Sequence, residues 1–207
     1  MSGDLFGGAK IPGVSLLPGF AADEAGLIAA AETVAAVSPF RVMAVPSGAK
    51  MSAAITNCGV AGWMSDRRGY RYQAHDPETG RAWPEMPDVF RGLATRAAAQ
   101  AGFAGFVPDV CLMNRYAPGA KMGLHQDRDE VDFAAPIVSV SLGLPAVFLW
   151  GGPKRTDRIV RLPLASGDVV VWGGAERLYF HGIAPIKPGS HTILGAMRLN
   201  LTFRRAL

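Results

Sequence analysis

Two segments in the first half of the chain have the hydrophobic spacing of amphipathic helices. Residues 87–101 repeat apolar positions every three to four residues, with Pro87 near the start and Gly102 just beyond the end, where these residues favour helix termini. Residues 22–37 show the same period, with an apolar face formed by Leu27, Ile28, Ala31, Val34 and Ala35. Two helices are therefore predicted before residue 108.

From residue 108 onward the pattern changes to short apolar runs separated by Pro-Gly, Gly-Gly and Ser-Gly turns. The stretch 133–153 carries no charge, but its Pro and Gly residues and its β-branched alternation favour buried strands over a membrane-spanning helix. Strands are predicted over residues 109–116, 137–142, 146–150, 158–164, 168–172, 178–183 and 197–204.

The remaining segments are less regular. Residues 1–20 are rich in Gly and Pro and are predicted to form a loop or a short edge strand. Residues 40–86 combine weak strand signals and many turn residues with Trp63, Tyr70, Tyr72 and Trp83, which favours a β-rich lid over a core element.

The predicted fold class is α+β and mainly β. Short strands at this spacing are typical of a double-sheet jelly roll (double-stranded β-helix), here flanked by N-terminal helices and the lid. We place the helices and the lid in residues 1–107 and the jelly-roll core in residues 108–207, which together form one compact unit.

Composition narrows the class of protein. Of the 207 residues 49% are hydrophobic and 18% charged, which suits a folded domain and excludes a disordered chain. A net charge of +4 and a pI near 9.3 favour polyanionic partners. The two cysteines, Cys58 and Cys111, are too few for a disulfide framework and are predicted to be buried thiols. Because the N-terminal residues lack the features of an export signal, we expect a cytoplasmic protein without membrane association.

One short pattern is of a type that binds metal. His125 and Asp127 follow a predicted strand and turn, and His181 lies in another predicted strand 54 residues after Asp127. Two histidines and one carboxylate form the usual site for non-haem Fe(II) in oxygenases. A His-x-Asp/Glu pair arises by chance in about one such sequence in three, so turn residues and a hydrogen-bonded core histidine are the alternatives. His75 and His191 lie in the lid and in a loop and are weaker candidates.

The last predicted strand has a polar face. A period of two places Arg198, Asn200, Thr202 and Arg204 on one side and apolar residues on the other. A solvated edge strand is the simple interpretation of such a face. Two guanidinium groups with an amide between them also form a receptor for a small dicarboxylate, because each planar fork can bind a carboxylate at two points. Strand 109–116 would add the side chains of Leu112, Asn114 and Tyr116 to the same ligand.

In combination these stretches resemble the bacterial AlkB family of Fe(II)- and 2-oxoglutarate-dependent dioxygenases, which dealkylate nucleic-acid bases. The resemblance extends from about residue 38 to residue 205. It is carried by Thr56-Asn57-Cys58-Gly59, Trp63, Gly69-Tyr70, the run from Asn114 to Lys121, the run from His125 to Glu130, Ser139 to Gly143, Gly167 to Gly174, and Arg198 to Arg204.

The resemblance implies a role for each of these residues. Fe(II) would bind to His125, Asp127 and His181. The cosubstrate 2-oxoglutarate would bind to Asn114, Tyr116, Arg198, Asn200 and Arg204, with Arg198 favoured for the distal carboxylate. A flipped-out base would lie between Trp63 and His125 with Tyr70 nearby, and Asp129 would face the base. Arg155 and Lys121 would contact the nucleic acid.

The implied reaction is oxidative demethylation of 1-methyladenine and 3-methylcytosine in DNA, with RNA as a further substrate. O₂ and 2-oxoglutarate would be consumed, and formaldehyde, succinate and CO₂ released. The base would have to be single-stranded or flipped out of a duplex, and we expect a monomer. Two alternatives remain open: the same iron chemistry on tRNA or another natural modified nucleotide, and a non-catalytic jelly roll that binds single strands.

Overall fold

The computed structural model describes residues 13–207, and the predicted loop over residues 1–12 lies outside the described residues. The two predicted helices are present as α1 (Glu24–Val37) and α2 (Asp88–Gln100). The strands are β1 (Val14–Leu17), β2 (Ala54–Gly59), β3 (Gly62–Asp66), β4 (Gly69–Gln73), β5 (Val110–Tyr116), β6 (Met122–His125), β7 (Ile137–Gly143), β8 (Ala146–Trp150), β9 (Val160–Leu164), β10 (Val169–Trp172), β11 (His181–Ile183) and β12 (Arg198–Arg204).

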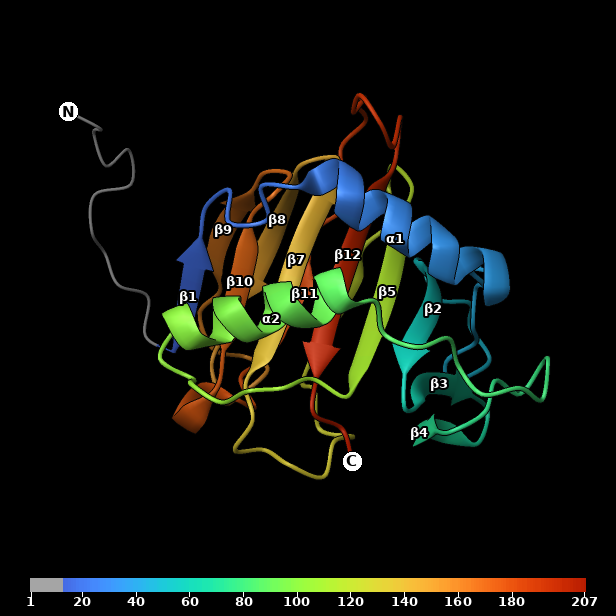
Figure 1. Ribbon diagram of the computed structural model, residues 1–207. Helices are drawn as coiled ribbons and strands as arrows, with labels where there is room; N and C mark the ends of the chain where they lie inside the picture. Colours follow the sequence, from blue (N-terminus) through green and yellow to red (C-terminus); the bar gives the residue numbers. More distant parts are fainter. Residues whose placement is uncertain (1–12) are drawn as a thin grey trace.

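Within residues 13–207 the strands form two facing sheets and a separate hairpin. The major sheet has six strands in the order β1-β10-β7-β12-β5-β2, and the minor sheet has four in the order β6-β11-β8-β9. Strands β3 and β4 pair only with each other, beside β2 at the edge of the major sheet (Figure 1). The predicted jelly roll, mainly β with N-terminal helices, is confirmed.

Helices α1 and α2 cover the outer face of the major sheet (Figure 1). Leu27 and Phe90 from these helices pack in one core with Leu201 and Phe203 from β12. A second core lies between the two sheets and contains Ile137, Phe148, Trp150, Val170 and Trp172. Strand β7 is buried along its whole length, which explains why the stretch around it carries no charge.

The structure corrects two expectations about strands. Residues 40–86 were predicted to form a lid and no core element, yet β2 within them is a buried strand that pairs with β5 in register from Ala54 to Gly59. Thr56 and Asn57 are polar, so the sequence of β2 does not read as a core strand. In the structure both side chains are buried, and hydrogen bonds satisfy them. Strand β6 was not predicted, because it is short, contains Gly123 and pairs at the edge of the minor sheet only with β11.

The strands before residue 108 therefore belong partly to the major sheet and partly to the separate hairpin. Strands β1 and β2 form the two edges of the major sheet, whereas β3 and β4 form a hairpin at its side. Across residues 13–207 no helix is long and apolar enough to cross a membrane.

Candidate metal centre

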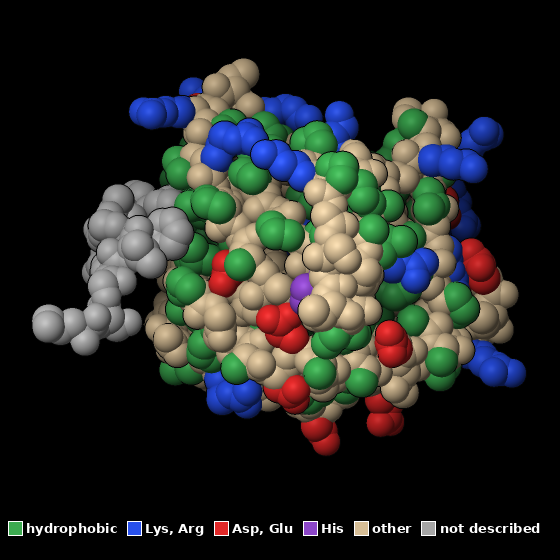
Figure 2. Space-filling view, turned by 90° about the horizontal axis from the view of Figure 1, so that it is seen from above, with side chains coloured by type: hydrophobic (Ala, Val, Ile, Leu, Met, Phe, Trp, Pro, Cys, Tyr) green, Lys and Arg blue, Asp and Glu red, His purple; other side chains and the backbone are tan. Residues whose placement is uncertain are grey.

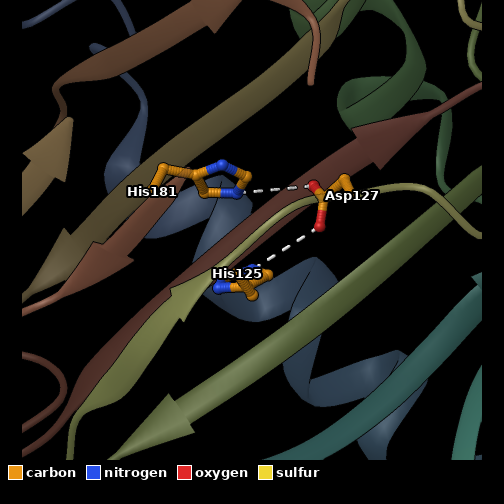
Figure 3. A group of neighbouring side chains, drawn as sticks. All are labelled: His125, Asp127 and His181. Carbon is orange, nitrogen blue, oxygen red and sulfur yellow. Dashed lines mark ion pairs between the residues drawn. The ribbon is translucent and has the colours of Figure 1, made fainter. Parts of the chain in front are cut away.

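Three predicted side chains converge at the open end of the minor sheet. His125 ends β6 and lies directly opposite His181, the first residue of β11, while Asp127 lies in the loop after β6. The ligand atoms of the three residues all lie within 4.8 Å of one another. His125 Nε2 is 3.5 Å from Asp127 Oδ1, and His181 Nε2 is 3.7 Å from Asp127 Oδ2 (Figure 3).

Backbone carbonyl groups set the orientation of both imidazole rings. His125 Nδ1 lies 2.9 Å from the oxygen of Gly123, and His181 Nδ1 lies 3.0 Å from the oxygen of Tyr179. Each Nδ1–H can donate to its carbonyl, which leaves Nε2 as a lone-pair donor that faces Asp127. When neutral, both rings therefore offer Nε2 as the ligand atom.

Burial and charge act in different directions on the three groups. Burial, with the neighbouring His125, lowers the pKa of His181 to about 3, so this ring is neutral. Burial opposes charge on Asp127 as well, but Arg204 and His125 outweigh it and hold its pKa well below the ordinary value. Burial also acts to lower the pKa of His125, yet Asp127 raises the net value above normal. One anionic and one neutral ligand are thus present at pH 7.

A network of buried ion pairs surrounds Asp127. Arg204 donates from Nη2 to Asp127 Oδ2 at 2.8 Å and pairs through Nε with Glu130 Oε1 at 3.2 Å. Arg177 donates to Glu130 Oε2 at 3.2 Å and to the Asp127 carbonyl oxygen at 2.7 Å. Because Arg177 lies four residues before His181, it connects the two segments that carry the triad.

Strands β5 and β12 form a polar floor next to the triad. Asn200 donates to Ser139 Oγ at 2.8 Å and accepts hydrogen bonds from Asn114 and Thr202 at 3.1 and 2.9 Å. All these side chains are buried. The predicted polar face of the last strand is therefore correct in register, but it points into the molecule and not into solvent.

Several polar atoms on this floor are buried without a partner. Among the described residues, Arg198 Nε and Nη1, Arg204 Nη1 and Asn114 Oδ1 make no hydrogen bond. Arg198 is completely buried, which lowers its pKa, and its guanidinium lies 5.0 Å from the centre of the Tyr116 ring. Unpaired buried guanidinium nitrogens are costly, and a dicarboxylate bound here would satisfy them.

A cavity of about 730 Å³ joins the triad, the polar floor and the hairpin. Arg198 lies behind Tyr116 and does not line it. The other predicted site residues do: His125, Asp127, His181, Asn114, Tyr116, Asn200, Arg204, Trp63, Tyr70, Asp129, Arg155 and Lys121.

The hairpin places aromatic side chains at the mouth of this cavity. The Trp63 ring stacks on Tyr70 with centroids 5.4 Å apart, and its Nε1–H donates to Asp129 Oδ2 at 2.8 Å. The Trp63 backbone is fixed at both its N–H and its carbonyl by the side chain of Asn57 on β2. Arg155 donates to the Leu124 carbonyl oxygen at 2.7 Å and lies above the Phe180 ring.

Sequence reasoning missed several residues that the structure brings to the site. Ser139 lines the cavity without having been proposed as a site residue, and Thr202, which the period of two had placed on the polar face, lines it too although it was given no role. Glu130 lies in the charged run after His125, and the sequence does not distinguish a buried acidic residue from a solvent-exposed one in such a run. Arg177 had no signal, because its partners are 42 to 50 residues away. The loop from Lys50 to Ala53, which also lines the cavity, had none either.

The profile of the 2OG-Fe(II) oxygenase superfamily matches residues 13–204. The alpha-ketoglutarate-dependent dioxygenase AlkB of Escherichia coli (strain K12) is 58% identical over 173 residues, which cover 84% of this chain and 80% of that protein. The chain belongs to the AlkB family of this superfamily.

Two further AlkB-type proteins extend the likeness. The AlkB homolog of Caulobacter vibrioides (strain NA1000 / CB15N) is 46% identical over 199 residues, which cover 95% of this chain and 89% of that protein. The solved structure of OsALKBH1 superposes with a TM-score of 0.81 at 31% identity and covers 95% of this chain and all of its own. The AlkB-family fold thus accounts for nearly the whole described chain.

Family membership decides between the function classes. The protein is an enzyme, a dioxygenase that uses Fe(II), 2-oxoglutarate and O₂, and the interpretation as a non-catalytic binding module is wrong. The triad has the donor set expected for Fe(II), and the unpaired guanidinium groups fit a dicarboxylate cosubstrate.

Proposed function

We propose that this AlkB-family enzyme removes alkyl groups from the nitrogen atoms of nucleic-acid bases. The observation that carries the proposal is one cavity that is lined by an Fe(II)-type triad, by the buried Arg204 guanidinium with its free Nη1 and by a stacking tryptophan. With iron, 2-oxoglutarate and O₂ bound, the centre would supply oxidation of the carbon attached to the ring nitrogen. A methyl group would leave as formaldehyde, and 2-oxoglutarate would be converted to succinate and CO₂.

His125, Asp127 and His181 are the proposed iron ligands. Their support is the shared orientation of the Nε2 atoms and the ionised state of Asp127. Behind them, Arg204 and Arg177 hold the carboxylate and the backbone of Asp127, so the ligand loop needs little rearrangement when iron binds.

The cosubstrate site comprises Asn114, Tyr116, Arg198, Asn200 and Arg204. Arg204 lines the cavity beside Asp127 and has Nη1 free for a carboxylate near the iron. Arg198 lies deeper and has two free nitrogens, which suits the distal carboxylate. The neutral amides of Asn114 and Asn200, which are hydrogen-bonded to each other, line the same floor of the cavity.

The base site lies between Trp63 and the exposed edge of His125, with Tyr70 and Asp129 beside it. A base methylated at N1 of adenine or N3 of cytosine is cationic, so the Asp129 carboxylate favours it over the neutral base. The base reaches this depth only when unpaired or flipped out.

Basic residues around the mouth fit a polyanionic strand. Lys50, Lys121 and Arg155 line the cavity and are exposed. Figure 2 shows most of the visible Lys and Arg side chains in the upper half of the view, the side that faces away from helices α1 and α2. DNA is the proposed main substrate, RNA is a further candidate, and the monomeric state and the cytoplasmic location stay predictions.

The test is turnover on short oligonucleotides that contain 1-methyladenine or 3-methylcytosine, in DNA and in RNA form. We expect formaldehyde and succinate in equal amounts from methylated DNA, and only slow uncoupled succinate formation with the unmethylated control. Uncoupled turnover at the same rate with every oligonucleotide would contradict the proposal.

A further inference from the structure

Two hydrogen bonds of different character join the β3–β4 hairpin to the loop that carries Asp127. Trp63 and Tyr72 are directly opposite each other in the hairpin, so their side chains share one face. Trp63 Nε1–H donates to Asp129, and Tyr72 Oη–H donates to the next residue, Glu130, at 2.7 Å. One face of the hairpin is thus attached at two consecutive carboxylates.

The two attachments differ in burial. Asp129 is exposed and lines the cavity mouth, whereas the Glu130 side chain is only 2% exposed. Tyr72 packs against the small apolar cluster of Ala61, Val110 and Ala206. Burial raises the pKa of the Tyr72 phenol well above its ordinary value, so its hydroxyl stays protonated and donates. The exposed bond is open to replacement by a ligand, while the buried bond is not.

Glu130 also connects the hairpin to the triad. Its Oε1 accepts from Tyr72 and pairs with Arg204 Nε at 3.2 Å, and Arg204 holds Asp127 through Nη2 at 2.8 Å. Hydrogen bonds to a charged group are the stronger kind. A continuous chain of buried contacts therefore runs from Tyr72 on β4 to the proposed iron ligand.

We infer that Tyr72 is a positioning residue for the base site. Its hydroxyl anchors the hairpin to Glu130 and so holds Trp63 in position across the cavity mouth, while Trp63 exchanges its bond to Asp129 for the substrate. This inference rests on the proposed function. Since Glu130 keeps its ion pairs with Arg204 and Arg177 when the hydroxyl is lost, the hydroxyl acts on base affinity and leaves the iron and cosubstrate sites unchanged.

The variant that isolates this role is Tyr72→Phe, which removes one oxygen atom and retains the packed ring. Its matched control is Ser65→Ala, which removes another hydroxyl from the same hairpin, one that donates to the Ala44 carbonyl oxygen at 2.7 Å and makes no contact with the ligand loop. Glu130 variants are unsuitable, because they would also release Arg204 and Arg177.

Binding is measured by fluorescence anisotropy with a labelled 3-methylcytosine oligonucleotide, Mn(II) in place of iron, and 2-oxoglutarate. For Tyr72→Phe we expect the dissociation constant to rise about tenfold, the fold-change equivalent to the loss of about one hydrogen bond to a charged group. The KM for the oligonucleotide should rise with it, while kcat and the KM for 2-oxoglutarate stay within about twofold of wild type. Ser65→Ala should match wild type in both constants.

A nucleic-acid-free measurement separates the anchor from the proposed function. Amide hydrogen exchange across residues 62–73 should accelerate in Tyr72→Phe more than in Ser65→Ala. Unchanged exchange and unchanged oligonucleotide affinity in Tyr72→Phe would overturn the inference, as would equal losses in both variants. If the wild-type enzyme fails to demethylate any oligonucleotide, the proposed function fails, and the exchange data still decide whether the hydroxyl anchors the hairpin.

Discussion

The floor of the cavity and the β3–β4 hairpin, which forms its lid, differ in burial and in the contacts that hold them in place. The floor residues on β5 and β12 are buried in the major sheet, and each of these strands has a neighbour on both sides. The β3–β4 hairpin has no partner strand beyond itself and is joined to the rest of the protein by side-chain bonds, among them those with Asn57, Asp129 and Glu130 and the bond from Ser65 to the Ala44 carbonyl oxygen.

This difference separates the requirements of the two sites. Iron and cosubstrate sites need fixed ligand geometry, which a rigid sheet provides. The base site has to admit a large ring attached to a strand, which an element with fewer attachments allows. We therefore expect changes in the floor to affect every partial reaction and changes in the lid to affect only those that involve nucleic acid.

The largest effect should come from the triad. Asp127→Ala should lower succinate formation more than about 100-fold, because even changes behind metal ligands cost about 10- to 100-fold. Loss of Mn(II) binding, measured by calorimetry, should accompany it. Asp132→Ala, on the same loop, is the control. Near-normal succinate production by Asp127→Ala would refute the ligand assignment.

The second effect concerns the deepest part of the floor. Arg198→Lys preserves the charge but loses the planar fork, so the KM for 2-oxoglutarate should rise about tenfold or more, with or without nucleic acid. Arg161→Lys on β9 is exposed and should match wild type. An unchanged KM in Arg198→Lys and in Arg204→Lys would remove the cosubstrate site from this face of β12.

In the lid, Trp63→Ala should weaken oligonucleotide binding by about 1–3 kcal/mol, or about 5- to 150-fold. Uncoupled succinate formation should persist. Trp63 is half-buried, whereas Trp83 is 5% exposed, so Trp83→Ala should instead lower thermal stability. A folded Trp63→Ala enzyme with full repair of 3-methylcytosine would contradict the stacking role.

The smallest effect concerns the loop after the hairpin, which Asp76 ties to Arg41 near the end of α1. The Arg41 hydrogen bond lowers the pKa of Asp76, so its contribution is present at neutral pH and lost as the pH falls through this lowered value. Asp76→Asn should lower the free energy of unfolding by about 1–3 kcal/mol at pH 7. The deficit relative to wild type should shrink below about pH 4. Denaturant titrations at several pH values measure this, and a deficit independent of pH would refute the ion-pair explanation.

Local sequence patterns locate much of the fold and part of the site. Regular periodicity and turn residues located both helices and most strands, and the period of two placed Arg198, Asn200 and Arg204 on one face. Strand β2 was misassigned because its buried Thr56 and Asn57 form hydrogen bonds that appear only in the folded chain.

Charge pairs between residues far apart in the sequence could not be predicted either, because they too form only in the folded chain. Glu130 and Arg177 are residue types that usually lie on the surface, and their burial is stabilised by their mutual ion pair and by further partners such as Arg204 and Tyr72. The hairpin was recognised as aromatic and turn-rich, but its attachment through Tyr72 to Glu130 spans 58 residues and leaves no local pattern.

The alternation along β12 has a consequence for how this protein can fail. Leu199, Leu201 and Phe203 pack toward the helices, while Arg198, Asn200 and Arg204 point to the opposite side. A slip of β12 by a single residue would exchange the two sets, pressing guanidinium groups against the helices and leucines onto the polar floor. The register that packs the core is therefore also the register that builds the cosubstrate site. A molecule with β12 mispaired would be both unstable and inactive.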